Sequence, residues 1–592
     1  MNEQNAGAAR KISYRSLWKI LGPYWWSEEK WVGRGLLGLI VGLNLGLVYL
    51  TVLFNQWNRV FYDAIQNKDY VSFKAQLLRF SMLAFIYIAV SVYRLYLNQM
   101  LEMKWRRWLT SRYLERWMTH QVYYRMELQR NGTDNPDQRI AEDIRLFTNG
   151  ALSLSLGLLS SVVTLASFTG ILWVLSGDLE FTLFQHQIII PAYMVWVAIT
   201  YACFGSYLTH WIGKALIRLN FKQQRYEADF RFGLVRVREN AEGIALYRGE
   251  ESERGNLDSR FVKILRNWWE IMKCQKRLTW FTASYSQVAI IFPILVAAPR
   301  FFSGAIQLGG LMQIASAFSN VQTALSWFID NYRPFAEWRA SVDRLTNFHE
   351  AIYKTESKQE EPRGLRIKAE QSPELSIENL NLRLPDGRVL FDNLSISIAP
   401  GDSVLIRGPS GVGKSTIFRA IAGIWPFGSG AICVRQDAGK LCLPQKPYLP
   451  IGTLRDAISY PERQGAFGDG KIKEALECCR LENFTMRMDE SAHWEQVMSP
   501  GEQQRLAFAR AILHKPEWLF LDEATSALDD ETQDYLYSML GRVLPDTSII
   551  SIAHRADLKQ FHNRILSLNP DGSYEFTTPA YPEIMLAAGN RS

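Results

Sequence analysis

Six long runs of apolar residues, separated by polar and basic stretches, mark the first 350 residues of the chain. They lie near residues 32–54, 77–97, 151–176, 188–209, 280–302 and 308–329. Each run is long enough to form a helix across the ~30 Å hydrocarbon core of a bilayer. The pattern predicts an all-α domain of six transmembrane helices over residues 1–350. Four or five spans with one long soluble helix is the alternative.

Basic residues set the expected orientation of these helices. The N-terminal segment and the connections after the second and fourth runs are rich in Lys and Arg, whereas residues 177–187 carry two acids and no Lys or Arg. Positive charge gathers on the cytoplasmic side of a membrane. We therefore expect both termini and both long connections to be cytoplasmic. The first 30 residues lack the apolar core of a cleavable signal, so targeting to the inner membrane would rest on the spans.

The sequence leaves open the roles of three polar features in the membrane half. Gln313, with Asn320 and Gln322 in the same run, favours a helix that lines a polar cavity. Arg94 and Arg300 lie near the ends of apolar runs, where arginines serve either a solute pathway or an anchor at the lipid headgroups.

Composition agrees with a membrane part joined to a soluble part. Apolar residues make up 48% of the 592 residues, with 19 Trp, while the mean hydropathy is −0.10. The six cysteines lack the paired spacing of a zinc site or a disulfide framework. Basic stretches that contain Trp105 and Trp108 favour contact with membrane lipid at the interface rather than with nucleic acid.

The apolar pattern changes after residue 350. Residues 351–374 are mostly charged or polar and predict a linker, and residues 375–592 alternate between strand-like and helix-like runs. This alternation predicts a second, α/β domain.

Residues 408–416 read Gly-Pro-Ser-Gly-Val-Gly-Lys-Ser-Thr, a complete phosphate loop between a strand-like and a helix-like run. Backbone N–H groups of such a loop point at phosphate oxygens, and the following helix adds its positive end. Lys414 would reach the outer phosphates of ATP, and Ser415 would bind Mg²⁺. The predicted ATP-binding residues are Gly408, Pro409, Ser410, Gly411, Val412, Gly413, Lys414, Ser415 and Thr416.

A second apolar run, residues 518–521, ends in two carboxylates. Asp522 is placed to hold Mg²⁺, and Glu523 to activate the water that attacks the γ-phosphate. Together with the phosphate loop, this pattern predicts an ATP hydrolase.

Residues 498–505, Met-Ser-Pro-Gly-Glu-Gln-Gln-Arg, complete a set of motifs that resembles the ATPase domain of ABC transporters over residues 375–585. The resemblance implies that Ser499 and Gly501 contact ATP bound to a second copy. It also implies that Gln445 senses Mg²⁺ and that Asp529 communicates across the dimer. His554 would steady the γ-phosphate as a catalytic partner of Glu523.

Finer motifs resemble a subfamily. Residues 423–426, 443–450 and 58–69 are similar to the peroxisomal fatty-acyl transporter subfamily and to SbmA/BacA-like bacterial proteins that keep their ATPase domain. This implies an exporter-like ABC fold. The stretch 242–250 would then couple the two domains through Glu242, Gly243 and Glu250, unless it is only a solvated helix face. Residues 382–387 lack the aromatic that usually stacks on adenine, which leaves the adenine contact open.

The resemblance implies a homodimeric, ATP-driven transporter with ATP and Mg²⁺ as cofactors. Its partners would be a second copy, membrane lipid and a bulky solute: a peptide, a vitamin-like or an acyl-type compound. Import and export both stay open. An ATP-gated channel, or a proton-driven permease with a regulatory ATPase, is the alternative, while a soluble ABC protein is excluded by the apolar runs.

Overall fold

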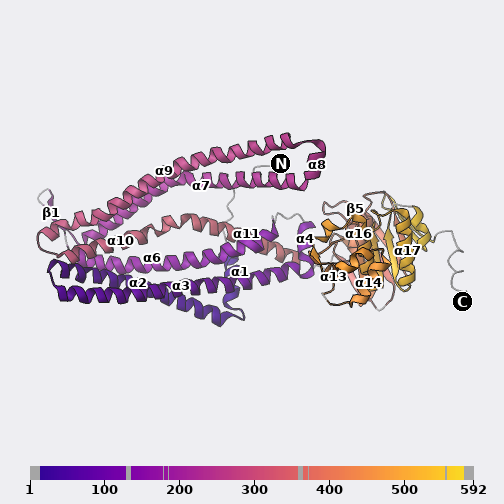
Figure 1. Ribbon diagram of the computed structural model, residues 1–592, viewed down its shortest axis with the longest axis horizontal. Helices are drawn as coiled ribbons and strands as arrows, with labels where there is room; N and C mark the ends of the chain where they lie inside the picture. The colour runs from indigo at the N-terminus through magenta and orange to yellow at the C-terminus, as the bar shows by residue number, and fades with distance from the viewer. Residues whose placement is uncertain are drawn as a thin grey trace. The chain divides into compact units, whose positions relative to one another are not determined.

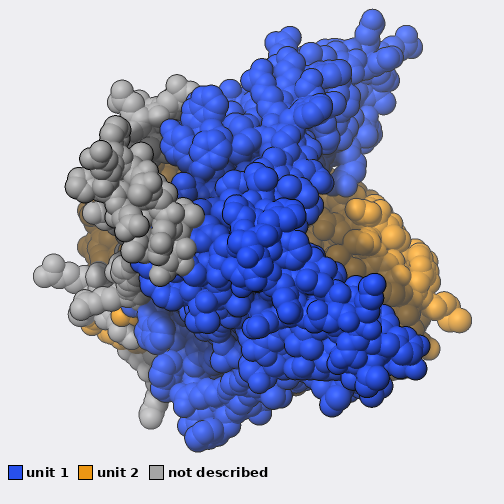
Figure 2. Space-filling view, turned by 90° about the vertical axis from the view of Figure 1, so that its left-hand side faces the viewer, with its two compact units in different colours: residues 1–116, 134–350 blue, residues 117–133, 351–592 orange. Residues whose placement is uncertain are grey.

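The structure is a computed structural model that describes residues 14–128, 135–177, 179–183, 186–357, 364–370, 372–435, 437–463, 465–553 and 556–578. The chain forms two compact units, coloured separately in Figure 2. The helical unit comprises Met1–Arg116 and Asp134–Glu350, and the sheet unit comprises Trp117–Thr133 and Ala351–Ser592. A short segment from the first half of the chain therefore belongs to the sheet unit.

The helical unit is built from long helices that follow the apolar runs (Figure 1). Its main helices are α1 (Tyr14–Trp25), α2 (Lys30–Gln66), α3 (Tyr70–Met118), α6 (Ile144–Ser176), α7 (Tyr193–Glu239), α8 (Ala241–Tyr247), α9 (Glu250–Phe302), α10 (Leu308–Asp330) and α11 (Tyr332–Ser357). Short helical pieces of this unit are α5 (Pro136–Gln138) and the π-helix η3 (Arg139–Asp143), whereas η2 (Thr119–Gln121) and α4 (Val122–Leu128) lie in the segment that belongs to the sheet unit. Several of these helices are far longer than a bilayer is thick.

Four helical stretches of the described residues are long and apolar enough to cross a membrane. They are Lys30–Gln66, Tyr70–Leu128, Pro136–Ser176 and Glu250–Phe302. The sixth predicted run lies on α10, whereas the fourth differs from the prediction at its start. Residues 188–190 belong to β2 (His186–Ile190), which pairs antiparallel with β1 (Leu179–Leu183), and α7 begins only at Tyr193. The run of isoleucines at 188–190 favours the strand because β-branched side chains suit an extended backbone.

Helices α6, α7, α9 and α10 share one apolar core. It includes Phe168 from α6, Met194 from α7, Ala297 from α9 and Phe318 from α10, each fully buried. The Tyr201 and Tyr285 rings stack with centroids 4.4 Å apart, and each hydroxyl donates to the other residue's carbonyl oxygen. This reciprocal pair fixes α7 against α9.

The sheet unit contains two main sheets. The first has the strand order β14-β13-β6-β12-β11-β8 and is parallel except for β14. The second has the order β3-β7-β4-β5. The strands are β3 (Leu365–Glu370), β4 (Leu375–Arg383), β5 (Val389–Ile398), β6 (Ser403–Arg407), β7 (Gly428–Arg435), β8 (Lys440–Leu443), β11 (Trp518–Asp522), β12 (Ser548–Ile552), β13 (Arg564–Leu568) and β14 (Tyr574–Thr577), and a small pair is formed by β9 (Gly452–Thr453) and β10 (Ser491–Ala492).

Helices cover the parallel sheet and create two apolar cores. They are α12 (Lys414–Ile421), α13 (Leu454–Ser459), α14 (Asp469–Cys478), α15 (Trp494–Val497), α16 (Pro500–His514) and α17 (Asp530–Val543), with the 3₁₀ helices η5 (Glu482–Arg487) and η6 (Ala556–Phe561). Strands β11 and β12 are buried over nearly every residue, which explains their continuous apolar sequence. The carboxyl ends of the parallel strands β6 and β11 therefore emerge at the same edge of the sheet.

Candidate active site

The phosphate loop, residues 408–416, joins β6 to α12 in the strand–loop–helix order that the sequence predicts. Gly408, Gly411 and Gly413 all have positive φ angles, of 152°, 81° and 106°. A Cβ atom at Gly408 would lie 2.6 Å from the carbonyl oxygen of Leu568, so only glycine fits there. The loop leads into the N-terminal end of α12, which favours a bound anion.

Lys414 begins α12 and points back over the loop. Its Nζ donates to the carbonyl oxygens of Gly408, at 2.8 Å, and Pro409, at 3.0 Å. Burial lowers the pKa of Lys414, and the negative charges of Glu523 and Asp522 act in the opposite direction. The structure thus places one buried cation between the loop and the two carboxylates that end β11.

Ser415 and Asp522 form a hydrogen-bonded pair of oxygens. Ser415 Oγ donates to Asp522 Oδ1 at 2.9 Å. Burial raises the pKa of Asp522, and the hydrogen bond from Ser415 partly offsets this effect. The described residues contain no group of three or more His, Cys, Asp and Glu side chains that could hold a metal ion. Mg²⁺ commonly binds one or two protein oxygens and completes its shell with phosphate oxygens and water, which this pair fits.

Glu523 stands in a strained backbone conformation directly after β11. Its φ is 51°, and its N–H donates to the carbonyl oxygen of Ile552 at 3.0 Å. A left-handed backbone is uncommon outside glycine and occurs often at functional sites. The register of β11 and β12 fixes this turn, because Asp522 pairs with Ile552.

The other loop residues are arranged around this centre. Pro409, Ser410 and Gly411 are exposed at the tip of the loop. Val412 packs against the apolar core, and Thr416 is buried. The loop therefore presents its backbone outward and anchors itself with its last residues.

Ser499 caps the N-terminus of α16 through a capping box. Its Oγ donates to Glu502 Oε2 at 2.9 Å and accepts from the Glu502 N–H, while its own N–H donates to the same carboxylate oxygen. Ser499 is exposed, and Gly501 lies in the first turn of the same helix. In the described part of the chain, no hydrogen bond joins Ser499 to the phosphate loop of its own copy.

Gln504 links three motifs, a role that sequence reasoning missed. Its side-chain nitrogen donates to the carbonyl oxygen of Gln445 at 2.9 Å and to Ser526 Oγ, and its oxygen accepts from the N–H of Ala527. Gln504 is 3% exposed. The position of Gln445 is thus tied to α16, although the Gln445 side chain itself is exposed.

Of the predicted residues Asp529 and His554, the structure describes only Asp529. Asp529 caps α17 by accepting a hydrogen bond from the Thr532 N–H at 2.8 Å, and the hydrogen bonds from Thr532 lower its pKa. His554 lies outside the described residues.

Helix α4 contributes to the sheet unit from the first half of the chain. Arg125 Nη2 donates to the carbonyl oxygen of Gly423 at 3.4 Å, and Leu128 packs against the core around Trp425. Val122 and Met126 are buried and four residues apart, on one face of the helix. That spacing is a sequence signal for a helix that packs through one face, whereas the motifs predict coupling only at residues 242–250.

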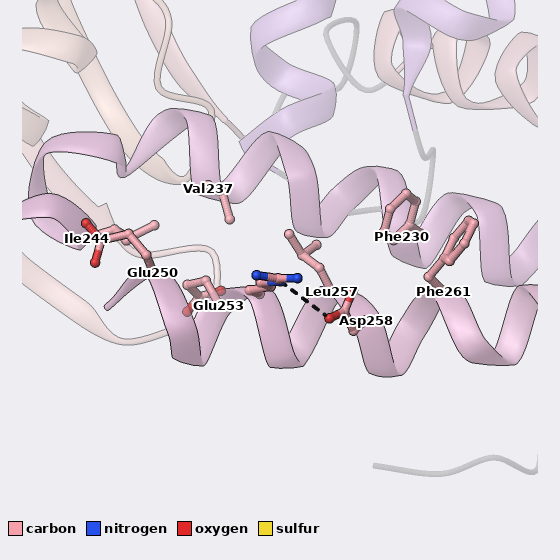
Figure 3. Close-up of a pocket in the computed structure, with 9 residues that line it drawn as sticks. Phe230, Val237, Ile244, Glu250, Glu253, Leu257, Asp258 and Phe261 are labelled. Atoms are coloured by element: carbon pink, nitrogen blue, oxygen red, sulfur yellow. Dashed lines mark ion pairs between the residues drawn. The ribbon is translucent and has the colours of Figure 1, made fainter. Parts of the chain in front are cut away.

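The predicted coupling residues Glu242, Gly243 and Glu250 lie in α8 and the first turn of α9. Figure 3 shows the hairpin of α7 and α9 beside them, where Phe230 and Val237 face Leu257 and Phe261 across a cavity of about 430 Å³. At the tip of the hairpin, Leu246 and Tyr247 are 77% and 89% exposed. The tip therefore exposes two large apolar side chains among charged ones.

Comparison with known proteins supports the resemblance found in the motifs. Residues 17–302 match the family described as ABC transporter transmembrane region 2, and residues 391–526 match the family described as ABC transporter. The inner membrane ABC transporter ATP-binding protein YddA of Escherichia coli is 34% identical over 542 residues, which cover 90% of this chain and 94% of YddA. The chain belongs to the ABC transporter family.

Other relatives of the transporter refine its place. ABC transporter D family member 2, chloroplastic, of Arabidopsis thaliana is 33% identical over 628 residues, which cover 94% of this chain and 86% of the plant protein. The solved structure of a bacterial Atm1-family ABC exporter with ATP bound has a TM-score of 0.71 at 20% identity, covering 92% of this chain and 95% of that one. The predicted type, a bacterial transporter that keeps its ATPase domain and is related to the peroxisomal fatty-acyl transporter subfamily, is confirmed, as is the predicted exporter-like fold.

These matches establish the general activity of the ABC transporter. It is a membrane protein of the half-transporter type that binds ATP and couples ATP hydrolysis to transport. The geometry around Lys414, Ser415 and Asp522 is the part of this chain that fits that chemistry.

Proposed function

We propose that the transporter works as a homodimer with two shared ATP sites, each built from the phosphate loop of one copy and from Ser499 and Gly501 of the other. The exposed capping box at Ser499 carries this proposal, since it has no hydrogen bond to its own loop within the described residues. The apolar tip at Leu246 and Tyr247 supports it, because a second copy would cover that surface.

The chemistry at each site follows from the pairing of oxygens and charges. Ser415 and Asp522 hold Mg²⁺ together with the phosphates, with Gln445 as a further ligand. Lys414 turns from its carbonyl partners to the outer phosphates, and Glu523 activates the attacking water. His554 steadies the γ-phosphate, and Asp529 communicates between the copies.

The membrane half moves a bulky solute through a cavity between the two copies. Six spans per copy are proposed, with both termini and the sheet unit in the cytoplasm. ATP binding draws the sheet units together and changes the packing of the helices, and hydrolysis resets them. Peptides, vitamin-like compounds and acyl-type compounds are the candidate solutes, in either direction.

The shared site is tested by mixing two inactive variants. Lys414→Ala removes the loop cation, and Ser499→Arg blocks the surface offered to the other copy. In a mixed dimer, one site carries both defects and the other carries none. Coexpression of the two variants should therefore restore up to half of the wild-type ATPase activity per mixed dimer.

Separately purified variants, each alone, are the controls and should be inactive. ATP sites formed within one copy would leave the mixture as inactive as its parts, and the homodimer proposal would then fail. ATP-driven solute uptake or efflux in sealed vesicles separates the transporter from the gated channel, because a channel cannot build a gradient.

A further inference from the structure

Arg94 lines a partly open cavity of mixed polar and apolar character inside the helical unit. The cavity has a volume of about 360 Å³ and is lined by residues of four helices, α2, α3, α6 and α10. Its polar lining comes from Asn44, Arg94, Asn98, Ser153, Ser160 and Ser161. None of its described lining residues is acidic. The cavity therefore carries one formal positive charge and several hydroxyl and amide groups.

The neighbours of Arg94 hold its side chain in place. Arg94 Nη1 donates to Asn44 Oδ1 at 3.0 Å, and Asn44 Nδ2 donates to the carbonyl oxygen of Leu156 at 3.0 Å. Asn44 is only 3% exposed, so its amide is fixed by the backbone of α6. One edge of the guanidinium is thereby oriented by the protein, while a guanidinium has five N–H groups in all.

Asn98 supplies a second, independent indication of a ligand. It follows Arg94 by four residues on α3, on the same face, and its buried side-chain oxygen has no hydrogen-bond partner among the residues that the structure describes. A buried polar atom that lacks a partner costs free energy. The oxygen and nitrogen of an amide exchange places by rotation about one bond, so Asn98 can turn its N–H₂ toward an acceptor in the cavity.

The contrast with Arg300 shows what is unusual about Arg94. Arg300 donates to the carbonyl oxygens of Leu175 and Ser176 at the end of α6, where helical carbonyls lack partners. Its charge faces the negative end of a helix. Among the described residues, the one hydrogen-bond partner of Arg94 is a neutral amide oxygen, although an ionised group within a spanning helix is costly and commonly functional.

We propose that this cavity, the Arg94 pocket, binds the anionic group of the transported solute, a carboxylate or a phosphate. The proposal rests on the proposed transport function. A guanidinium binds such oxyanions through paired N–H groups, and the hydroxyls of Ser160 and Ser161 with the Asn98 amide add donors. The phosphate of a lipid headgroup offers the same chemistry and is the second possible source of the anion.

The wall of the pocket also limits its size. A Cβ atom at Gly157 would lie 2.8 Å from Trp327 Nε1, so α6 and α10 approach each other here through glycine. A larger residue at 157 would push the indole. The pocket thus suits a compact head group, with the rest of a larger solute outside it.

Binding is tested on the full chain in phosphatidylcholine nanodiscs without ATP. Three probes carry the same octyl tail and differ in their heads: nonanoate, octyl phosphate and octyltrimethylammonium. We expect the two anions to bind the wild type and the cation not to bind at this site. Arg94→Gln should weaken the anions at least about tenfold, and Arg94→Lys should weaken them less, because a point charge keeps the attraction but loses the paired geometry.

Asn98→Asp is the more specific test, because it keeps Arg94. The new carboxylate, four residues away, would neutralise the positive charge of the Arg94 guanidinium. Anion binding should fall by at least as much as in Arg94→Gln. Arg79→Gln, on an exposed part of the same helix, is the matched control and should bind like the wild type. Equal binding of the three heads, or anion binding unchanged in Arg94→Gln and Asn98→Asp, would overturn the proposal.

The source of the anion is decided in nanodiscs that contain phosphatidylglycerol. Competition by this lipid that disappears in Arg94→Gln assigns the pocket to a headgroup, whereas unchanged probe affinity assigns it to a solute. Because these measurements need no ATP turnover, a failure of the shared ATP site would leave them readable. Conversely, restored ATPase activity in mixed dimers without anion binding would reject only the pocket.

Discussion

Two polar clusters, one in each unit of the chain, differ in how their side chains are partnered. In the sheet unit, Lys414, Gln504 and Arg510 all find partners within the same copy; Arg510, for example, donates to the carbonyl oxygens of Ala457 and Tyr448. In the helical unit, Arg94 and Asn98 line a cavity, and no hydrogen-bond partner for the Asn98 side-chain oxygen is found among the described residues. The first cluster holds its unit together, and we propose that the second receives another molecule.

The helices at the two connections repeat this contrast. Helix α4 packs into the sheet unit of its own chain through Arg125 and Leu128, whereas Leu246 and Tyr247 of α8 are exposed. An exposed apolar tip on a long hairpin is typical of an interaction surface. One chain therefore contains the binding partner of one connection, and we expect a second copy to supply the other.

Glu523→Gln should have the largest effect, because it removes the proposed base and keeps the shape of the side chain. ATP turnover should fall by about 10²–10⁴-fold, while ATP still binds. Steady-state phosphate release and nucleotide binding measure the two quantities. Glu517→Gln makes the same chemical change just before β11, at an exposed ion pair with Arg435, and should leave turnover unchanged. Turnover at the wild-type rate in Glu523→Gln would reject the assigned base.

Asp143→Ala should destabilise the helical unit by about 3–5 kcal/mol, because two arginines would lose a buried carboxylate. Asp143 is 2% exposed and accepts from Arg139 at 2.6 Å and from Arg344. Thermal melting in detergent measures the loss. The matched control is Arg333→Ala, which breaks an exposed pair with Glu337 and should cost at most about 1 kcal/mol. Equal shifts for both variants would show that burial does not matter here.

Acid should weaken the sheet unit through His562, which is buried and bonded to Ser551 Oγ at 2.9 Å and to the Leu558 carbonyl oxygen. Burial lowers the pKa of His562 from 6.5 to about 4. The unfolded chain therefore binds the proton more readily, so stability is full above pH ~6.5 and declines as the pH falls toward ~4. The loss is at most about 3 kcal/mol.

Chemical unfolding of the wild type and of His562→Gln, each between pH 7.5 and 4.5, measures this loss of folding stability. The variant should be less stable at neutral pH, with a smaller change of stability across the range. Identical pH dependence in both proteins would assign the acid sensitivity to other groups.

Arg125→Met should produce the smallest change, about 1 kcal/mol, since one long hydrogen bond to Gly423 is lost and the apolar stem is retained. The comparison variant is Tyr247→Ser on α8, which should leave the melting temperature of the monomeric chain unchanged because only a second copy would cover its side chain. If Tyr247→Ser melts lower than Arg125→Met, the contrast between α4 and α8 is wrong.

The phosphate loop and the ends of β11 could be predicted because their chemistry is local in sequence. Gly408 needs a positive φ, and Asp522 follows an apolar strand. The role of Gln504 could not be predicted, since its three partners come from distant segments. The start of the fourth apolar run was assigned to a helix, but its isoleucines pair with β1 as a strand. Apolar runs do not distinguish a short strand from the first turn of a helix.

Ser499 has one more consequence for the proposed dimer. Its hydroxyl already donates to Glu502 before any partner arrives, so contact with ATP on the other copy would exchange one hydrogen bond for another. An exchange of this kind adds little net free energy. Closure of the two copies would then be nearly reversible at this residue, and release after hydrolysis would require no strong bond to be broken there. Between successive cycles, the hydroxyl of Ser499 would return to its hydrogen bond with Glu502 in the capping box.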